Sequence, residues 1–315
     1  MEAAGHDKYR LVMAMAGRQP AVPTAVVHPC DAISLAGAIE AHRLGLIAVT
    51  LVAPEARLRA LAASSGLDIA DLPLVASEHS HDSAAKAVAL VRAGKVEALM
   101  KGSLHTEELM AAVVAHDTGL RTERRISHCF IMDVPGRPAP LIVTDAAVNI
   151  SPTLAEKADI VRNAIDVAHA LGLDRPLVAI LSATEEVNPA IPSTLEAAAL
   201  CKMADRGQIQ GGVLDGPLAL DNAIDPAAAA IKHIVSPVAG HANVLVVPNL
   251  EAGNMLAKSL SFLAGAESAG IVMGARVPIV LTSRADSVVT RLASCAVAVL
   301  VAAWRRRMVA RAAGG

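Results

Sequence analysis

The sequence predicts an α/β protein in which parallel strands alternate with helices. Short apolar runs rich in β-branched residues recur along the chain, and longer Ala- and Leu-rich segments with helical periodicity separate them. Strands that are apolar on both faces are typical of a parallel sheet covered by helices on each side. With 315 residues, 54% hydrophobic and 18% charged, the chain can bury a large core.

The first half of the chain shows this alternation most clearly. Because each apolar run is followed by a helical segment, these elements form βαβ units, whose strands are parallel. In order, they are strand 24–28, helix 31–45, strand 47–53, helix 54–66, strand 72–76, helix 83–94 and strand 95–102.

The alternation changes in the middle of the chain. Residues 125–149 contain two apolar runs joined by the turn sequence PGRP, a spacing that predicts an antiparallel pair or a crossing between domains. Further α/β units follow, and a long apolar helix at 287–312 is expected to pack back onto the first domain. We therefore expect two α/β/α domains with a cleft between them: residues 1–138 plus 283–315, and residues 139–282.

Composition argues against several classes of partner. The net charge is −2, and one Trp, one Tyr and two Phe leave no basic and aromatic surface for nucleic acid. The N-terminal residues lack the pattern of a secretory signal, so we expect a cytoplasmic protein. The apolar run 292–304 is too short for a bilayer span and predicts a buried helix, so no membrane role is expected.

Cysteines and histidines give no strong metal signal. The four cysteines are far apart in sequence and form no CxxC pair, so we expect reduced core thiols, with Cys30 after a strand as the one that could face a cleft. The segment SEHSHDS, 77–83, is interpreted as a solvated loop entering a helix, with metal binding as the alternative. GxGxxG, GxxxxGK[ST], GxSxG and HExxH are all absent from the sequence.

Polar clusters follow many of the apolar strands. In open α/β sheets, ligands bind at the carboxyl ends of the strands, so these clusters are candidate binding segments. An Asp or Asn directly before a helix is equally an N-cap, and that alternative stays open for Asp145, Asn222 and Asn254. The clusters are HPCD (28–31), KGSLHT (101–106), RISHCF (125–130), TDAAVN (144–149), LDGPLALDNAI (214–224), PNLEAGN (248–254) and TSRADS (282–287).

Several of these segments resemble the phosphate acetyltransferase and phosphate butyryltransferase family. The resemblance covers almost the whole chain, and its most specific part is PNLEAGN with SPVAG upstream and SR downstream. KGSLHTEELM and TSRADS are most similar to the butyryltransferase-like branch, including the transferase part of enoyl-CoA hydratase/phosphate acetyltransferase proteins. The matching runs are 28–47, 98–110, 212–224, 236–260 and 274–287.

The resemblance implies transfer of a short acyl group, acetyl or butyryl, between coenzyme A and inorganic phosphate. It also implies an isocitrate/isopropylmalate dehydrogenase-like fold and a homodimer. Coenzyme A, acyl phosphate and phosphate would be substrates, with no separate cofactor and no metal. Two alternatives are a metal- and NAD(P)-dependent dehydrogenase of the isocitrate type and a non-catalytic protein that binds coenzyme A or acyl phosphate.

The resemblance also implies roles for individual residues. Ser283 and Arg284 match the family's Ser-Arg pair, which would stabilise charge on the carbonyl oxygen and the departing phosphate. Asp286 is the candidate base for the thiol, although an ungapped alignment puts Thr290 at the position of the family's Asp, and Asp286 could instead cap the last helix.

The remaining candidates are substrate-binding residues. The family's arginine after KGSLHT is missing here, and Lys101, His105, Arg124 and Arg125 stay open as its replacement. The predicted substrate-binding set is Lys101, His105, Arg125, Ser127, Asp145, Asn149, Asn249 and Asn254.

Overall fold

The computed structural model describes residues 7–282 and 286–314, which form two compact α/β units. We call them the N-terminal unit, Tyr9–Arg124 with the residues from Ala269 onward, and the central unit, Arg125–Ser268 with the residues up to Lys8. The mixed α/β class predicted from the sequence is confirmed in both units.

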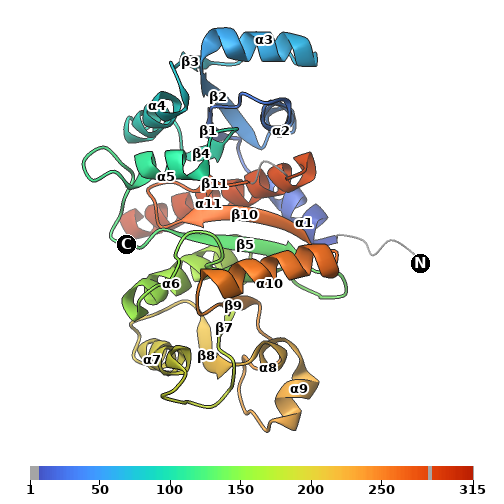
Figure 1. Ribbon diagram of the computed structural model, residues 1–315, viewed down its shortest axis with the longest axis vertical. Coiled ribbons are helices and arrows are strands. Elements are labelled where there is room, and N and C mark those ends of the chain that lie inside the picture. Colours follow the sequence, from blue (N-terminus) through green and yellow to red (C-terminus); the bar gives the residue numbers. More distant parts are fainter. Residues whose placement is uncertain (1–6, 283–285, 315) are drawn as a thin grey trace. The chain divides into compact units, whose positions relative to one another are not determined.

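The N-terminal unit contains a mostly parallel sheet with strand order β3-β2-β1-β4-β11-β10. Its pairs are parallel except for β10 and β11, which are antiparallel. Helices α2 and α4 lie on opposite sides of β1 and β2 (Figure 1). The strands are β1 (Val22–Val27), β2 (Ile47–Ala53), β3 (Leu74–Ala76), β4 (Ala98–Lys101), β10 (Glu267–Met273) and β11 (Ile279–Val280). The helices are α1 (Asp7–Ala16), α2 (Ala32–Arg43), α3 (Glu55–Ser65), α4 (Ser80–Arg92), α5 (Thr106–Val114) and α11 (Val288–Gly314).

The long helix α11 belongs to the N-terminal unit, as the sequence predicted. Its residues 292–303 are all buried, and the helix packs against α2, β4 and β11. By length and composition alone α11 could cross a membrane, but 72% of its most apolar stretch is buried inside the structure. That burial is expected of a core helix, which is apolar around most of its circumference.

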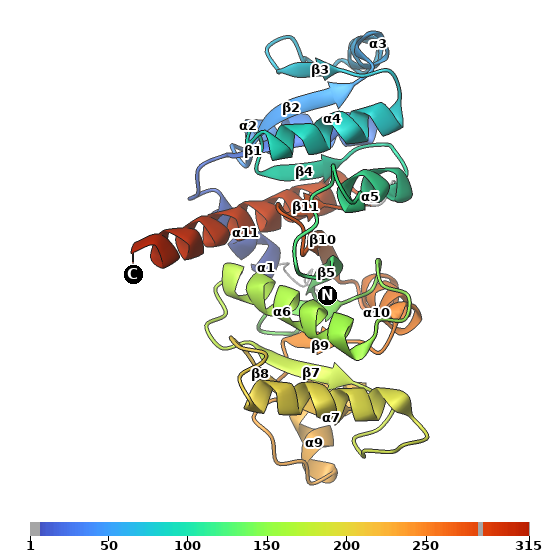
Figure 2. The ribbon, with the colours of Figure 1, turned by 90° about the vertical axis from the view of Figure 1, so that its left-hand side faces the viewer.

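The strands of the central unit follow the order β5-β6-β9-β7-β8. Strands β5 and β6 are antiparallel, and the other pairs are parallel. Helices α6 and α7 lie in front of these strands in Figure 2. The strands are β5 (Ser127–Asp133), β6 (Leu141–Thr144), β7 (Leu177–Leu181), β8 (Val213–Leu218) and β9 (Val244–Val246). The helices are α6 (Leu154–Ala170), α7 (Pro192–Asp205), α8 (Leu220–Ile224), α9 (Pro226–Ile231) and α10 (Leu250–Leu263).

The unit boundaries differ from the expected domain boundaries of 1–138 plus 283–315 and 139–282. The chain passes from one unit to the other at 124/125 and at 268/269. Each of these boundaries lies 14 residues before the expected one, at 124 instead of 138 and at 268 instead of 282. The physical reason is strand pairing: β5 pairs with β6 and stays in the central unit, while β10 pairs with β11, which pairs with β4 in the N-terminal unit. Strand β10 was not predicted from the sequence.

Candidate functional site

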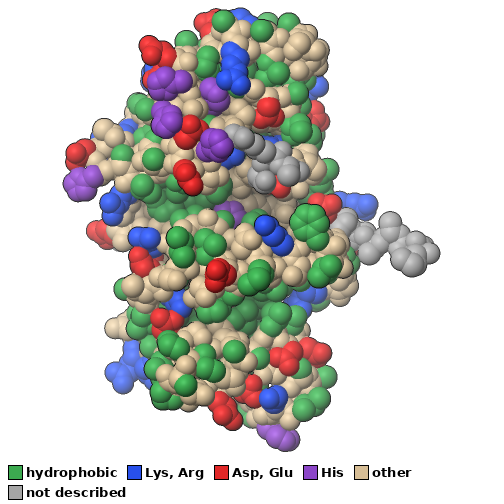
Figure 3. Space-filling model, viewed as in Figure 1, with side chains coloured by type: hydrophobic (Ala, Val, Ile, Leu, Met, Phe, Trp, Pro, Cys, Tyr) green, Lys and Arg blue, Asp and Glu red, His purple; other side chains and the backbone are tan. Residues whose placement is uncertain are grey.

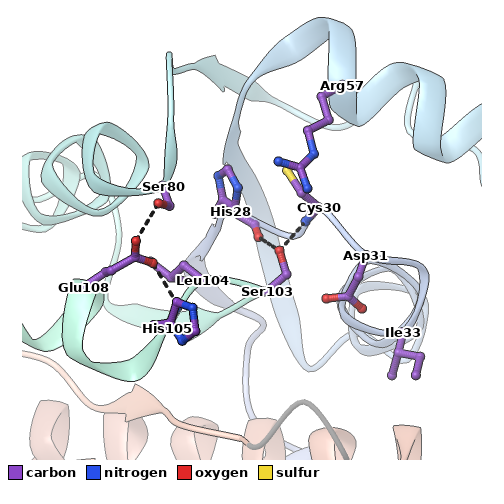
Figure 4. A pocket seen from close by; sticks show the side chains of 10 residues that line it. All are labelled: His28, Cys30, Asp31, Ile33, Arg57, Ser80, Ser103, Leu104, His105 and Glu108. Atoms are coloured by element: carbon purple, nitrogen blue, oxygen red, sulfur yellow. Dashed lines mark hydrogen bonds between the residues drawn. The ribbon is translucent and has the colours of Figure 1, made fainter.

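A pocket of about 520 Å³ opens at the carboxyl edge of the parallel strands in the N-terminal unit. The loops after β1 and β4 form its base, and helices α3, α4 and α5 contribute side chains to its rim (Figure 4). The space-filling view shows imidazoles and carboxylates gathered on the surface over α4 and α5 (Figure 3). The lining residues are His28, Cys30, Asp31, Ile33, Arg57, Ser80, Ser103, Leu104, His105 and Glu108.

The base of the pocket depends on a close backbone contact between the ends of β1 and β4. Gly102 donates its amide to the carbonyl of Val27 (2.9 Å), and Ser103 donates both its amide (2.9 Å) and its hydroxyl (2.8 Å) to the carbonyl of His28. A Cβ on Gly102 would lie 2.5 Å from both carbonyl oxygens, so only glycine fits. The Ser103 hydroxyl also accepts the amide of Cys30 at 3.1 Å, which joins both loops.

His28 has an unusual backbone conformation and a defined side-chain partner. Its φ of 55° lies in the left-handed region, which is uncommon for a residue with a side chain and is often found at functional sites. Its Nδ1 is 3.0 Å from the hydroxyl of Ser83, which shares a second hydrogen bond with Ser77. Burial, followed by the positive charge of Arg57, lowers the pKa of His28, so the imidazole is neutral at pH 7.

Cys30 is a protonated thiol in this environment. Burial is the largest cause that raises its pKa, and the nearby Asp31 carboxylate adds to the shift, against the charge of Arg57. Because the thiolate is the nucleophilic form, this shift argues against a nucleophilic role for Cys30.

The two carboxylates of the pocket already accept hydrogen bonds from the protein. Asp31 caps helix α2 by accepting the amide (2.8 Å) and hydroxyl (2.9 Å) of Ser34. Glu108 accepts the Ser80 hydroxyl (2.8 Å) and the His105 amide (2.9 Å). Burial opposes ionisation of Glu108, but these hydrogen bonds and the neighbouring imidazoles lower its pKa, so it remains charged.

The predicted residues of the N-terminal unit have different surroundings. His105 lines the pocket at the start of α5. Lys101 is buried, and its Nζ donates to the carbonyls of Gly102 (3.4 Å) and Thr282 (3.3 Å). Ser283 and Arg284 lie outside the described residues. Their roles as the charge-stabilising pair stay predictions.

Asp286 is half-buried and immediately precedes the residue that caps α11. The cap itself is Ser287, whose hydroxyl accepts the amide of Thr290 at 3.1 Å. The start of the last helix is therefore capped by the Ser287 hydroxyl, and this contact does not test the capping alternative for Asp286. Its role as a base stays a prediction.

Three predicted residues of the central unit form one hydrogen-bond network. Arg125 donates from Nε to Asn149 Oδ1 (2.6 Å), and Asn149 donates from Nδ2 to Asp145 Oδ2 (2.5 Å). Asp145 also accepts the backbone amides of Ala147, Val148 and Asn149 at 2.9–3.1 Å. Asp145 and Asn149 are both 3% exposed, and they organise the loop after β6. Arg125 also forms an ion pair with Glu156, at 3.0 Å.

The other three predicted residues lie close to this network. Ser127 is fully buried at the start of β5 and accepts a hydrogen bond from Asn163 (2.8 Å). Asn249 caps α10 by accepting the amide of Ala252 (2.9 Å), and Asn254 donates to the carbonyl of Ala146 (3.4 Å). Asn249 is thus the N-cap of α10, a role that was not predicted for it, while Asn254, for which capping was the alternative, lies within α10. Their contacts with substrate stay predictions.

The described residues form no candidate metal site. Within 7–282 and 286–314, no three His, Cys, Asp or Glu side chains lie close enough together to hold an ion. The segment 77–83 enters α4 as predicted, with His79 at the N-cap. Sequence reasoning missed Arg57 and Ser80 as pocket residues, because helical periodicity does not tell which exposed side chain faces a ligand.

Comparison with solved structures identifies the class of protein. A branched-chain phosphotransacylase from Enterococcus faecalis V583 has a TM-score of 0.76 at 30% identity, covering 89% of this chain and 99% of that one. A phosphotransacetylase from Streptococcus pyogenes has a TM-score of 0.81 at 21% identity, covering 93% of this chain and 98% of that one. The fold is therefore that of the phosphotransacylases.

Sequence relatives define the family. The chain is 66% identical over 301 residues to a phosphate acetyltransferase of Rhizobium meliloti, covering 95% of each chain. It is 42% identical over 263 residues to a phosphate butyryltransferase of Clostridium acetobutylicum, covering 84% of this chain and 87% of that one. Residues 72–299 match the family described as phosphate acetyl/butaryl transferase. The chain belongs to this family, and the resemblance found in the sequence is confirmed.

Proposed function

We propose that this protein catalyses the reversible reaction of an acyl-CoA with inorganic phosphate to give an acyl phosphate and free coenzyme A. The observation that carries the proposal is the 66% identity to a phosphate acetyltransferase over 95% of both chains. The acyl group is acetyl in that relative's name and butyryl in the name of the relative at 42% identity. Acetyl phosphate is therefore the preferred acyl donor, and butyryl phosphate is the second substrate to test.

The chemistry requires a thiolate and stabilisation of a developing anion. In the direction of thioester formation, the sulfur of coenzyme A bonds to the acyl carbon, the bond from that carbon to the phosphate oxygen breaks, and phosphate leaves. The thiol proton passes to a base, for which Asp286 is the candidate, and Arg284 and Ser283 would stabilise the carbonyl oxygen and the departing phosphate. The His28 imidazole is neutral at pH 7, so it adds no positive charge to the pocket.

The test of the function measures thioester formation from coenzyme A with acetyl, propionyl and butyryl phosphate, and then its reversal by added phosphate. Replacing Arg284 with Ala should lower kcat/KM by roughly 100-fold or more with an unchanged circular dichroism spectrum, since a charge-stabilising donor of this kind contributes about 10²–10³ in rate. Strict dependence on a divalent ion and NAD(P) would instead favour a dehydrogenase. Calorimetric binding of coenzyme A without turnover would favour a non-catalytic binding protein.

The proposal also covers the type of α/β fold, the oligomeric state and the cellular location. Likeness to a 4-hydroxythreonine-4-phosphate dehydrogenase from Klebsiella pneumoniae, with a TM-score of 0.55 at 15% identity, supports a dehydrogenase-like architecture of the isocitrate/isopropylmalate type. We also infer a cytoplasmic homodimer that needs no cofactor beyond its substrates. Light scattering of the purified protein tests the dimer.

A further inference from the structure

Arg291 carries a buried charge in an unfavourable position. It is 1% exposed and is among the largest fully buried side chains in the part of the chain that the structure describes. It lies in the first turn of α11, where the helix dipole disfavours a cation. Burial also removes the guanidinium from water, so this charge depends on hydrogen-bond acceptors that the protein supplies.

Two contacts of the Arg291 side chain define its position. Its Nη1 donates to the hydroxyl of Thr282 at 2.8 Å. Its aliphatic stem lies against the backbone of α2, because a Cβ added to Gly37 would come within 3.0 Å of the Arg291 Cδ. Thr282 is itself 3% exposed, so the hydrogen bond is shielded from water. A shielded hydrogen bond to a charged group is stronger than an exposed one, and it holds both side chains in one geometry.

This hydrogen bond joins the two ends of the segment that contains the predicted Ser-Arg pair. Thr282 follows β11 and directly precedes Ser283, whereas Arg291 belongs to α11. The two bonded residues are nine positions apart in the sequence. The contact therefore closes the connection between β11 and α11, and the pair lies between its ends in the sequence.

Packing alone does not require a guanidinium at position 291. Replacing buried charged side chains with apolar ones of similar volume is often neutral or stabilising. The next two positions of α11 show that apolar side chains are accommodated here, since Leu292 and Ala293 are both buried. The charge at position 291 therefore indicates a role in holding Thr282, beyond the stability of the core.

We propose that Arg291 is a positioning residue for the acyl transfer reaction. By holding the Thr282 hydroxyl, it orients the start of the segment that carries the predicted charge-stabilising pair, Ser283 and Arg284. The inference rests on the proposed function, and it assigns to Arg291 no contact with substrate. Its effect is on kcat, because the predicted pair acts on charge that develops in the transition state.

The first experiment measures kcat and KM for thioester formation from acetyl phosphate and coenzyme A. Arg291→Met removes the donor, and Thr282→Val removes the acceptor while keeping the shape of the side chain. In each variant kcat should fall by roughly 10- to 100-fold, the loss expected when a catalytic group moves by up to about 1 Å, with both KM values within about twofold of the wild type. Thr282→Ser keeps the hydroxyl and should therefore keep most of the activity. A loss in KM with an unchanged kcat would refute the positioning role.

The double variant Arg291→Met/Thr282→Val separates positioning from stability. With both partners removed, no buried polar group of the pair is left unsatisfied, so its urea midpoint should recover from the value for Thr282→Val. Its kcat should nevertheless stay as low as in either single variant, because both substitutions remove the same hydrogen bond. The inference is wrong if kcat recovers together with stability, or if the two single losses multiply.

Ser294→Ala is the matched control on the same helix. The Ser294 hydroxyl is fully buried and accepts the amide of Gly270 at 2.9 Å, away from Thr282 in the sequence. Its removal should lower stability but leave kcat within about twofold of the wild type. A kcat loss equal to that of Arg291→Met would mean that any destabilisation of α11 slows the reaction, which would also refute the inference.

Hydrogen exchange separates this inference from the proposed function. A wild type that forms no thioester refutes the proposed function, and exchange of the peptide that carries Thr282 then still tests the role of Arg291. We expect exchange to be about tenfold faster in Arg291→Met and Thr282→Val than in the wild type and in Ser294→Ala. Equal exchange in all four proteins would show that Arg291 does not hold this segment.

Discussion

Gly102 offers the sharpest test of the structure around the pocket, through the substitution Gly102→Ala. The added Cβ would lie 2.5 Å from the carbonyl oxygens of Val27 and His28 and 2.6 Å from the carbonyl carbon of His28. Ordinary contact begins at 3.4 Å, so the ends of β1 and β4 would have to separate by about 0.9 Å. All three atoms belong to the backbone, and no side-chain rotation relieves the overlap.

The magnitude follows from the contacts that this movement breaks. The amides of Gly102 and Ser103 each donate to a β1 carbonyl at 2.9 Å, and each lost hydrogen bond costs about 1 kcal/mol. Overpacking in a rigid environment adds about 1–3 kcal/mol. We therefore expect the free energy of unfolding to fall by about 3–5 kcal/mol, a large part of the 5–15 kcal/mol typical of a folded domain.

Urea unfolding followed by circular dichroism measures this change. Gly17→Ala is the control, because its added Cβ would meet its nearest atom, the carbonyl oxygen of Met13, at an ordinary 3.4 Å. We expect the control to remain within about 0.5 kcal/mol of the wild type. If Gly102→Ala were as stable as the control, the close contact between the ends of β1 and β4 would be refuted.

Two further predictions concern buried polar groups. Asp145→Ala leaves the amides of Ala147, Val148 and Asn149 without their acceptor, and it should lower the free energy of unfolding by about 3 kcal/mol in a urea titration; a loss below 1 kcal/mol would contradict the network. The pKa of His28 in the folded protein lies below its ordinary 6.5. Below pH 6.5 the unfolded chain therefore binds more protons at this residue than the folded protein does. The free energy of unfolding consequently falls as the pH drops from 6.5 through the lowered pKa. His28→Asn, which tolerates a positive φ, should lose less stability than the wild type between pH 7.5 and 5.5, and equal losses would exclude His28 as a cause of acid sensitivity.

The sequence predicted the parts of the fold that follow from local pattern. Continuous apolar strands with helices between them correctly predicted the parallel pairs of β1, β2 and β4. The PGRP turn left two alternatives open, an antiparallel pair or a crossing between domains, and the structure shows the antiparallel pair of β5 and β6. Strand β10 was missed because Ser268 and Gly270 interrupt its apolar run. It forms a strand through its pairing with β11, a tertiary contact that local propensity does not contain.

The candidate site was predicted less completely than the fold. The clusters after β1 and β4 were recognised, because their position at strand ends follows from the predicted topology. Arg57 and Ser80 were missed, since they lie on helices whose exposed faces look alike in sequence. The sequence left open whether Asp145 caps a helix or contacts a ligand. In the structure its carboxylate instead accepts backbone amides of the loop that follows β6.

The surroundings of Thr282 connect buried charge to the predicted catalytic pair. Thr282 directly precedes Ser283 and is 3% exposed. Lys101 donates to its carbonyl at 3.3 Å, and Arg291 of α11 donates to its hydroxyl at 2.8 Å. Both cations are at least 97% buried, and a buried charge is retained only where partners compensate its loss of water. Two such charges therefore hold Thr282, the residue before the predicted pair, so we expect Lys101 to act as a positioning residue even without a contact to substrate.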